Sequence, residues 1–114
     1  MKSLNGDGYT AEYDSSQQRV SLAGSLRLNG LTEYAPISAL LDEALDQPGR
    51  IELDLTRLEF LNSSGIATLS KFVIAARNRQ SCELSIRGSN SVPWQGKSLN
   101  NLKRLMPALE LTLE

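Results

Sequence analysis

The sequence predicts a single α/β domain in which an opening β-hairpin is followed by alternating strands and helices. Apolar and polar residues alternate over residues 20–28, and residues 9–13 form a second strand-like segment before a polar turn, which is typical of a hairpin. Apolar residues then recur at helical spacing over residues 34–45 and again over residues 66–76. Strand-like alternation returns after each of these helices. This order implies a mixed sheet with right-handed parallel crossovers and helices packed against it.

Turn-forming residues divide the first half of the chain. Residues 1–8 contain several of them and are expected to be a loose segment at the start of the domain. Gly24 interrupts a strand pattern, which favours a β-bulge or a close approach of another backbone. The first helix is expected to start at Thr32, with Pro36 in its first turn, where a missing N–H is least harmful. It is expected to end before the Pro-Gly pair at residues 48–49.

The second half of the chain is expected to hold two more helices and a final strand. Residues 62–65 form a turn, and either Ser63 or Ser64 can cap the helix that follows, because a hydroxyl accepts from the unpaired N–H groups of the first turn. Ser98 is expected to cap a third helix in the same way. Trp94 is expected either to anchor the loop before this helix or to form a contact surface. The alternating tail after the third helix is expected to add an edge strand.

Composition excludes several classes of function. The 114 residues include 12 Lys plus Arg against 13 Asp plus Glu, so the net charge of −1 lacks the basic footprint of a non-specific nucleic-acid binder. The absence of His excludes imidazole-based catalysis and the usual His-containing zinc sites, and the single cysteine, Cys82, cannot form an internal disulfide. No apolar run has the length of a membrane span or a secretion signal, so we expect a cytoplasmic protein without membrane insertion.

No catalytic, cofactor-binding or metal-binding residue is predicted. Gly96, Lys97 and Ser98 resemble the end of a phosphate-binding P-loop, but the glycine that this motif requires five residues earlier is Ser91. No serine is followed three residues later by a lysine, so the Ser-x-x-Lys arrangement of some hydrolases is absent. Because no side chain has an ordinary pKa near neutrality, we expect that the chain is not an enzyme.

The pair Ser63 and Ser64 is the strongest candidate for a functional site. Two adjacent hydroxyls at the start of a helix suit phosphorylation, because the exposed N–H groups and the helix dipole stabilise the added negative charge. The alternative is purely structural: one serine caps the helix and the other faces solvent.

The middle of the chain resembles the STAS domain family, whose best-known members are bacterial anti-sigma-factor antagonists. The resemblance lies in residues 51–66, IELDLTRLEFLNSSGI, and in residues 20–26, VSLAGSL, a strand that ends in Gly-x-Leu. It implies partner switching in signal transduction and transcription regulation. In such systems a GHKL-type serine kinase that doubles as an anti-sigma factor phosphorylates the first serine of the turn, and a serine phosphatase reverses the reaction. By position the acceptor is Ser63, with Ser64 as the second choice. The partner-binding residues that the resemblance implies are Gly24, Leu26, Arg27, Asn62, Ser63, Ser64 and Gly65.

Two residues depart from the family pattern. Asn62 stands where the family has an acidic residue, so one negative charge is lost beside the acceptor. Arg27 stands where many antagonists have an acidic residue, which reverses the charge on the expected docking edge. The resemblance also implies an alternative function, because similar domains serve as constitutive subunits of membrane transport complexes. In that case the serine pair would be contact surface only.

Overall fold

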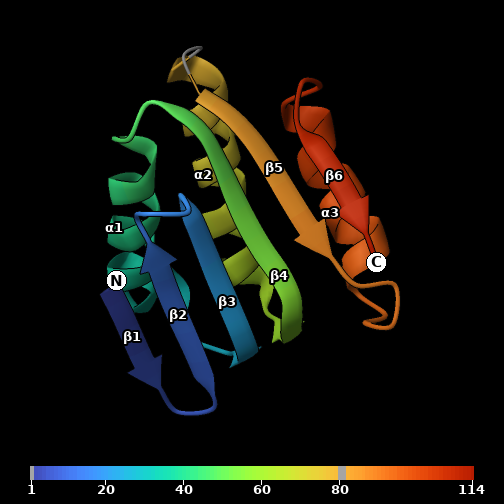
Figure 1. The fold of residues 1–114 in the computed structure, drawn as a ribbon. Helices are drawn as coiled ribbons and strands as arrows, with labels where there is room; N and C mark the ends of the chain where they lie inside the picture. Colours follow the sequence, from blue (N-terminus) through green and yellow to red (C-terminus); the bar gives the residue numbers. More distant parts are fainter. Residues whose placement is uncertain (1, 80–81) are drawn as a thin grey trace.

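A computed structural model describes residues 2–79 and 82–114, which form six strands and three helices in one α/β domain (Figure 1). The strands lie in the sheet in chain order, with antiparallel pairing from β1 to β3 and parallel pairing from β3 to β6. The predicted fold class, an opening hairpin followed by a mixed sheet with packed helices, is confirmed. The elements are β1 (Lys2–Gly6), β2 (Tyr9–Asp14), β3 (Arg19–Leu26), α1 (Gly30–Leu45), β4 (Gly49–Leu61), α2 (Ser63–Arg79), β5 (Cys82–Gly88), α3 (Gln95–Leu105) and β6 (Glu110–Leu113).

All the helices lie on one side of the sheet, behind it in Figure 1. Each parallel connection moves one strand further in the same direction, and right-handed crossovers then place every helix on the same face. The side chains of the strands alternate accordingly between a buried face and an open one. Buried strand positions are Ala11, Tyr13, Val20, Leu22, Ile51, Leu53, Leu55, Leu84 and Ile86.

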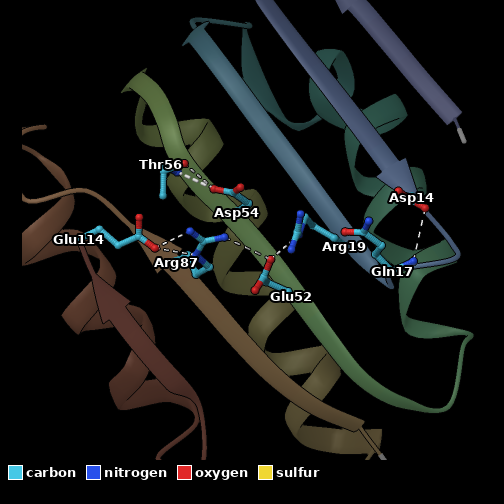
Figure 2. Close-up of polar contacts among 8 residues, drawn as sticks. All are labelled: Asp14, Gln17, Arg19, Glu52, Asp54, Thr56, Arg87 and Glu114. Atoms are coloured by element: carbon cyan, nitrogen blue, oxygen red, sulfur yellow. Dashed lines mark hydrogen bonds and ion pairs between the residues drawn. The ribbon is translucent and has the colours of Figure 1, made fainter.

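The open face of the sheet is polar, and its charges pair with one another. Glu52 on β4 lies between Arg19 on β3 and Arg87 on β5, and it forms ion pairs with both (Figure 2). Arg87 also donates to Glu114 at 2.8 Å, and this carboxylate raises the pKa of the guanidinium. At the turn before β3, Ser16 donates from its hydroxyl to Asp14, which lowers the pKa of that carboxyl. The charged side chains of the open face are therefore solvated and mostly paired with one another.

Gly24 fulfils both expectations for a glycine inside a strand. The register between β3 and β4 shifts on either side of it, as in a bulge. Its φ is +87°, and a Cβ at this position would lie 2.2 Å from the carbonyl oxygen of Gly8. Any side chain at residue 24 would therefore force apart the backbones of β3 and the β1–β2 turn.

The start of the chain differs from the loose segment expected over residues 1–8. Lys2–Gly6 form β1, which pairs with β2 from Lys2 opposite Tyr13 to Gly6 opposite Tyr9. Only two residues, Asp7 and Gly8, connect the strands, and Gly8 has a φ of +83°. An Asp-Gly pair between two short polar strands is a hairpin signal, and the free edge of β2 supplies the hydrogen-bonding partner. Met1 lies outside the described residues.

Two helix starts also differ from expectation. Helix α1 begins at Gly30 rather than Thr32, which places Pro36 in the second turn. Helix α3 begins at Gln95, so Ser98 is its fourth residue and does not cap it. Trp94 anchors the preceding loop, because its Nε1 donates to the carbonyl oxygen of Glu59 at 3.0 Å. The predicted edge strand is present as β6.

Candidate functional site

The predicted Ser-Ser turn lies at the carboxyl end of the parallel strands, at the lower end of Figure 1. Strands β3 and β4 stop together here, with Leu26 and Leu61 as their last register pair. The chain then enters α1 after β3 and α2 after β4. In open α/β sheets this edge, where loops join strand ends to helix starts, is the favoured place for binding.

Asn62 ties these segments together with both ends of its amide. Its Oδ1 accepts from the Gly65 N–H at 3.0 Å and from the Tyr34 hydroxyl at 2.6 Å. Its Nδ2 donates to the carbonyl oxygen of Leu28 at 2.7 Å. The bond to Gly65 is the N-cap of α2, so Asn62 caps this helix and the expected serine cap is wrong.

The cap formed by Asn62 leaves the serine pair available. Ser63 is the first residue of α2 and is exposed, whereas Ser64 is half-buried. Among the described residues, neither the Ser63 nor the Ser64 hydroxyl has a hydrogen-bond partner within the protein, so the two serines differ in exposure; the Ser64 carbonyl accepts from the Thr68 hydroxyl at 2.9 Å. Of the two free hydroxyls, that of the exposed Ser63 is the one presented most openly to solvent at the positive end of a 17-residue helix.

The other residues expected to bind a partner divide into supporting and exposed groups. Leu26 has 1% of its surface exposed and belongs to the core, and Gly65 is buried. A Cβ on Gly65 would lie 2.2 Å from the Leu61 side chain and 2.8 Å from the Tyr34 hydroxyl, so only glycine fits there. Gly24 shapes the bulge described above. Leu26, Gly65 and Gly24 thus have structural roles in shaping the Ser-Ser turn.

Arg27 and two exposed apolar side chains lie at this end of the sheet. Among the described residues, the exposed large apolar side chains are Leu31, 48% exposed, and Phe60, 39% exposed. Leu31 is the second residue of α1, and Phe60 is the next-to-last residue of β4. The Arg27 guanidinium lies over the Phe60 ring, 4.7 Å from its centroid. We call these three residues the Arg27–Phe60–Leu31 surface.

Sequence reasoning missed the part of Tyr34 in this corner. Its position at helical spacing placed it correctly on the buried face of α1, where it is 1% exposed. Burial raises the pKa of its hydroxyl, which therefore stays protonated and donates to Asn62 at neutral pH. No sequence signal pairs a tyrosine with an asparagine 28 residues away, because the contact depends on the crossover between β3 and β4.

A hollow lies at the opposite end of the sheet. Its volume is about 470 Å³, and its mostly apolar lining includes Cys82, Leu84 and Met106. Burial raises the pKa of the Cys82 thiol, which disfavours the reactive thiolate. Within residues 2–79 and 82–114, no group of three or more His, Cys, Asp or Glu side chains is arranged to hold a metal ion. None of the helices in these ranges is long and apolar enough to cross a membrane.

Comparison with known families and structures agrees with this geometry. The sequence model described as "Mlab, STAS domain" matches residues 10–110. The chain belongs to the STAS domain family. The comparison with curated protein sequences gave no significant match.

The STAS fold of this chain is also similar to solved structures of SiaC from Pseudomonas aeruginosa. One SiaC structure has a TM-score of 0.75 at 18% identity and covers 100% of this chain and 98% of its own. Apo-SiaC gives 0.75 at 19% identity, with 100% and 99% coverage. A chain in the crystal structure of the diguanylate cyclase SiaD in complex with its activator SiaC gives 0.77 at 15% identity, with full coverage of both chains. At these identities the likeness establishes the shared fold.

Proposed function

We propose that this STAS domain is a regulatory protein-binding module, controlled by reversible phosphorylation of Ser63. The observation that carries the proposal is the free, exposed Ser63 hydroxyl at the start of α2, beside a cap that Asn62 supplies instead. The resemblance to anti-sigma-factor antagonists supports a GHKL-type serine kinase as the modifying partner and a serine phosphatase as the reversing one. The finer assignment to transcription control rests on that resemblance alone.

The geometry of the first turn favours a phosphorylated state. The Gly65 N–H donates to the Asn62 side chain, and the Ile66 N–H donates to the Asn62 carbonyl at 2.9 Å. The N–H groups of Ser63 and Ser64 precede the first intrahelical bond and have no partner among the described residues, so they can face an anion. In the transfer, Ser63 Oγ forms a bond to the γ-phosphorus of ATP, ADP leaves, and the hydroxyl proton goes to a base on the kinase.

Phosphorylation would change what can dock while leaving the fold in place. A phosphoryl group adds roughly −1.5 to −2 charges at neutral pH. Ser63 is exposed and its hydroxyl forms no hydrogen bond among the described residues, so the fold does not depend on the unmodified side chain. A partner that covers this corner when Ser63 is free would then meet charge repulsion and the desolvation of a phosphate.

Mass spectrometry of the chain after incubation with ATP and each GHKL-type kinase of the same genome tests the proposal. We expect one added phosphate, mapped to Ser63, that is lost in Ser63→Ala and kept in Ser64→Ala. Ser70→Ala is the matched control, because this hydroxyl donates to the Ile66 carbonyl within α2. The absence of modification at both Ser63 and Ser64 with every kinase would overturn the proposal.

A binding measurement separates the switch from the alternative of a constitutive transport subunit. We expect the kinase to bind the unmodified chain and to lose affinity for Ser63→Asp. Full binding of Ser63→Asp to a membrane transport complex would instead favour the constitutive role, in which the serine pair is contact surface.

A nucleotide cyclase is a second candidate partner. Its support is the likeness of the whole chain to chains of SiaC, which is the activator of the diguanylate cyclase SiaD. The measurement is the rate of cyclic dinucleotide formation by diguanylate cyclases of the same genome, with and without this chain. Stimulation that disappears in Ser63→Asp would place a cyclase downstream of the switch, whereas unchanged rates would exclude this candidate.

A further inference from the structure

The Arg27–Phe60–Leu31 surface combines residue types that are common in protein-binding interfaces. Single exposed apolar residues are ordinary, but here both exposed large apolar side chains of the described chain lie at the end of the sheet that carries Ser63. An arginine stacked on a phenylalanine joins two residue types that are enriched in the cores of protein interfaces. The stacking also limits the freedom of the guanidinium before any partner arrives, which reduces the entropy lost on binding.

The charge on this surface is unpaired. Within residues 2–79 and 82–114 Arg27 forms no ion pair, in contrast to Arg19 and Arg87 on the open face, which share Glu52. Arg27 also lines a hollow of about 450 Å³ together with Asp7, Gly8, Ser25 and Leu28. Asp7 is the acidic residue in that lining, so a second carboxylate is favoured at the N–H edge of the guanidinium outside the hollow, since the Phe60 ring covers one face of the group.

The two chain neighbours of Arg27 are hydrogen-bonded to Asn62, the residue before Ser63. The carbonyls of its two neighbours both bind Asn62: Leu26 accepts from the Asn62 N–H at 3.2 Å, and Leu28 accepts from the Asn62 amide at 2.7 Å. Arg27 is thus fixed beside the residue that precedes Ser63. A partner that covers Arg27 lies next to the serine.

We infer that the docking partner is a protein segment that presents an acidic side chain to Arg27 and an adjacent apolar side chain to Phe60. The inference rests on the proposed function, since it names the chemistry of the partner that the Ser63 corner binds. It also gives the switch a physical basis, because a phosphate on Ser63 places negative charge beside the approach path of an acidic partner.

Selection from a random twelve-residue peptide library tests this chemistry without any kinase. The target is the unmodified chain, and the enriched peptides are measured by isothermal titration calorimetry at two salt concentrations. We expect Asp or Glu next to a large apolar residue in the enriched sequences. We also expect binding to weaken roughly tenfold or more in Arg27→Glu and in Phe60→Ala, as for hot-spot residues.

Matched variants keep the result interpretable. Arg104→Glu makes the same charge change at an exposed position near the end of α3 and is expected to leave peptide affinity unchanged. Arg27→Lys keeps the charge and is expected to retain part of the affinity, and equal thermal midpoints for all variants exclude unfolding as the cause. Enrichment of basic peptides, or equal effects of Arg27→Glu and Arg104→Glu, would overturn the inference. Because Ser63 is unmodified throughout, such a failure is distinct from a failure to find phosphorylation.

Discussion

The polar side chains at the starts of α2 and α3 have different roles. At α2 the cap comes from Asn62, which precedes the helix, and the first helical residue, Ser63, faces solvent. At α3 the first helical residue, Gln95, is 0% exposed and turns inward. Its Nε2 donates to the carbonyls of Leu55 and Leu58 at 2.7 and 2.9 Å, and its Oε1 accepts from the Ser89 N–H at 2.7 Å.

The difference between the two starts follows from the edges of β4. Its pairing with β5 stops at Asp54, so the β4 carbonyls beyond that point have no strand beside them on that edge. Gln95 and Trp94 donate hydrogen bonds to carbonyls in this stretch, and we call these bonds at the start of α3 the seal of β4. On the other side β3 pairs as far as Leu61, so the start of α2 has no carbonyls of β4 to seal. The outward surface at the start of α2 is therefore free for binding.

The largest expected effect is at the seal. Gln95→Leu keeps a similar volume but leaves the carbonyls of Leu55 and Leu58 and the Ser89 N–H without their partner. Because buried polar groups that lose their hydrogen bonds are costly, we expect a loss of about 3 kcal/mol in the free energy of unfolding. Urea denaturation followed by circular dichroism measures it.

The control for this substitution is Asn101→Ala, at an exposed position on the same helix, which is expected to change stability by less than about 0.5 kcal/mol. A Gln95→Leu variant as stable as this control would show that the β4 carbonyls need no seal, and the contrast between the two helix starts would fail.

A smaller loss is expected at the Asn62 cap. Asn62→Ala removes the bonds to Gly65, Tyr34 and Leu28 at a partly solvated corner, and we expect it to cost about 2 kcal/mol. Asn62→Asp keeps the acceptor for Gly65 but replaces the donor to Leu28 by an oxygen, so its loss should be about half as large. Equilibrium unfolding of both variants measures the difference.

Ser63→Ala is the matched control for the cap, and we expect it to change stability by less than about 0.5 kcal/mol. Equal losses in Asn62→Ala and Ser63→Ala would mean that the serine shares the capping role, and the argument for a free hydroxyl would collapse.

Sequence patterns predict the strands and helices of this fold better than they predict the side-chain hydrogen bonds that join them. Alternation and helical spacing predicted β2 to β6 and all three helices, because burial on one face leaves a periodic trace. A serine before a helix is a common cap, yet here Asn62 caps α2, and the side chains of Asn62 and Gln95 also bind partners 28 to 40 residues away. Such contacts exist only after the sheet order is set. The exposure of Ser63 follows from one of them, so sequence could nominate the serine but could not show that it is free.

The Tyr34 hydroxyl offers a pH test of the corner. Its pKa in the folded state is raised by burial above the usual value of about 10, so its contribution to stability is complete below that pH. As the pH rises from about 10 through the folded-state pKa, the unfolded chain releases this proton more readily and the contribution is lost. We expect Tyr34→Phe to lose about 1 kcal/mol at neutral pH and to show a shallower decline in alkali.

Urea unfolding of wild type and Tyr34→Phe at several alkaline pH values measures this difference. Some decline will remain in the variant, because burial also raises the pKa values of Tyr13 and Cys82. Parallel alkaline profiles for the two proteins would show that the hydroxyl gains nothing from its place beside Asn62.

The smallest effect is expected at Ser98, the other serine that sequence favours as a cap. Its N–H donates to the Trp94 carbonyl at 3.3 Å, so its backbone is already inside the helix, and among the described residues its hydroxyl has no partner within the protein. Alanine has the higher helix propensity, so Ser98→Ala should leave stability unchanged or raise it by up to about 0.5 kcal/mol in thermal or urea unfolding. A loss above about 1 kcal/mol would restore Ser98 as a cap.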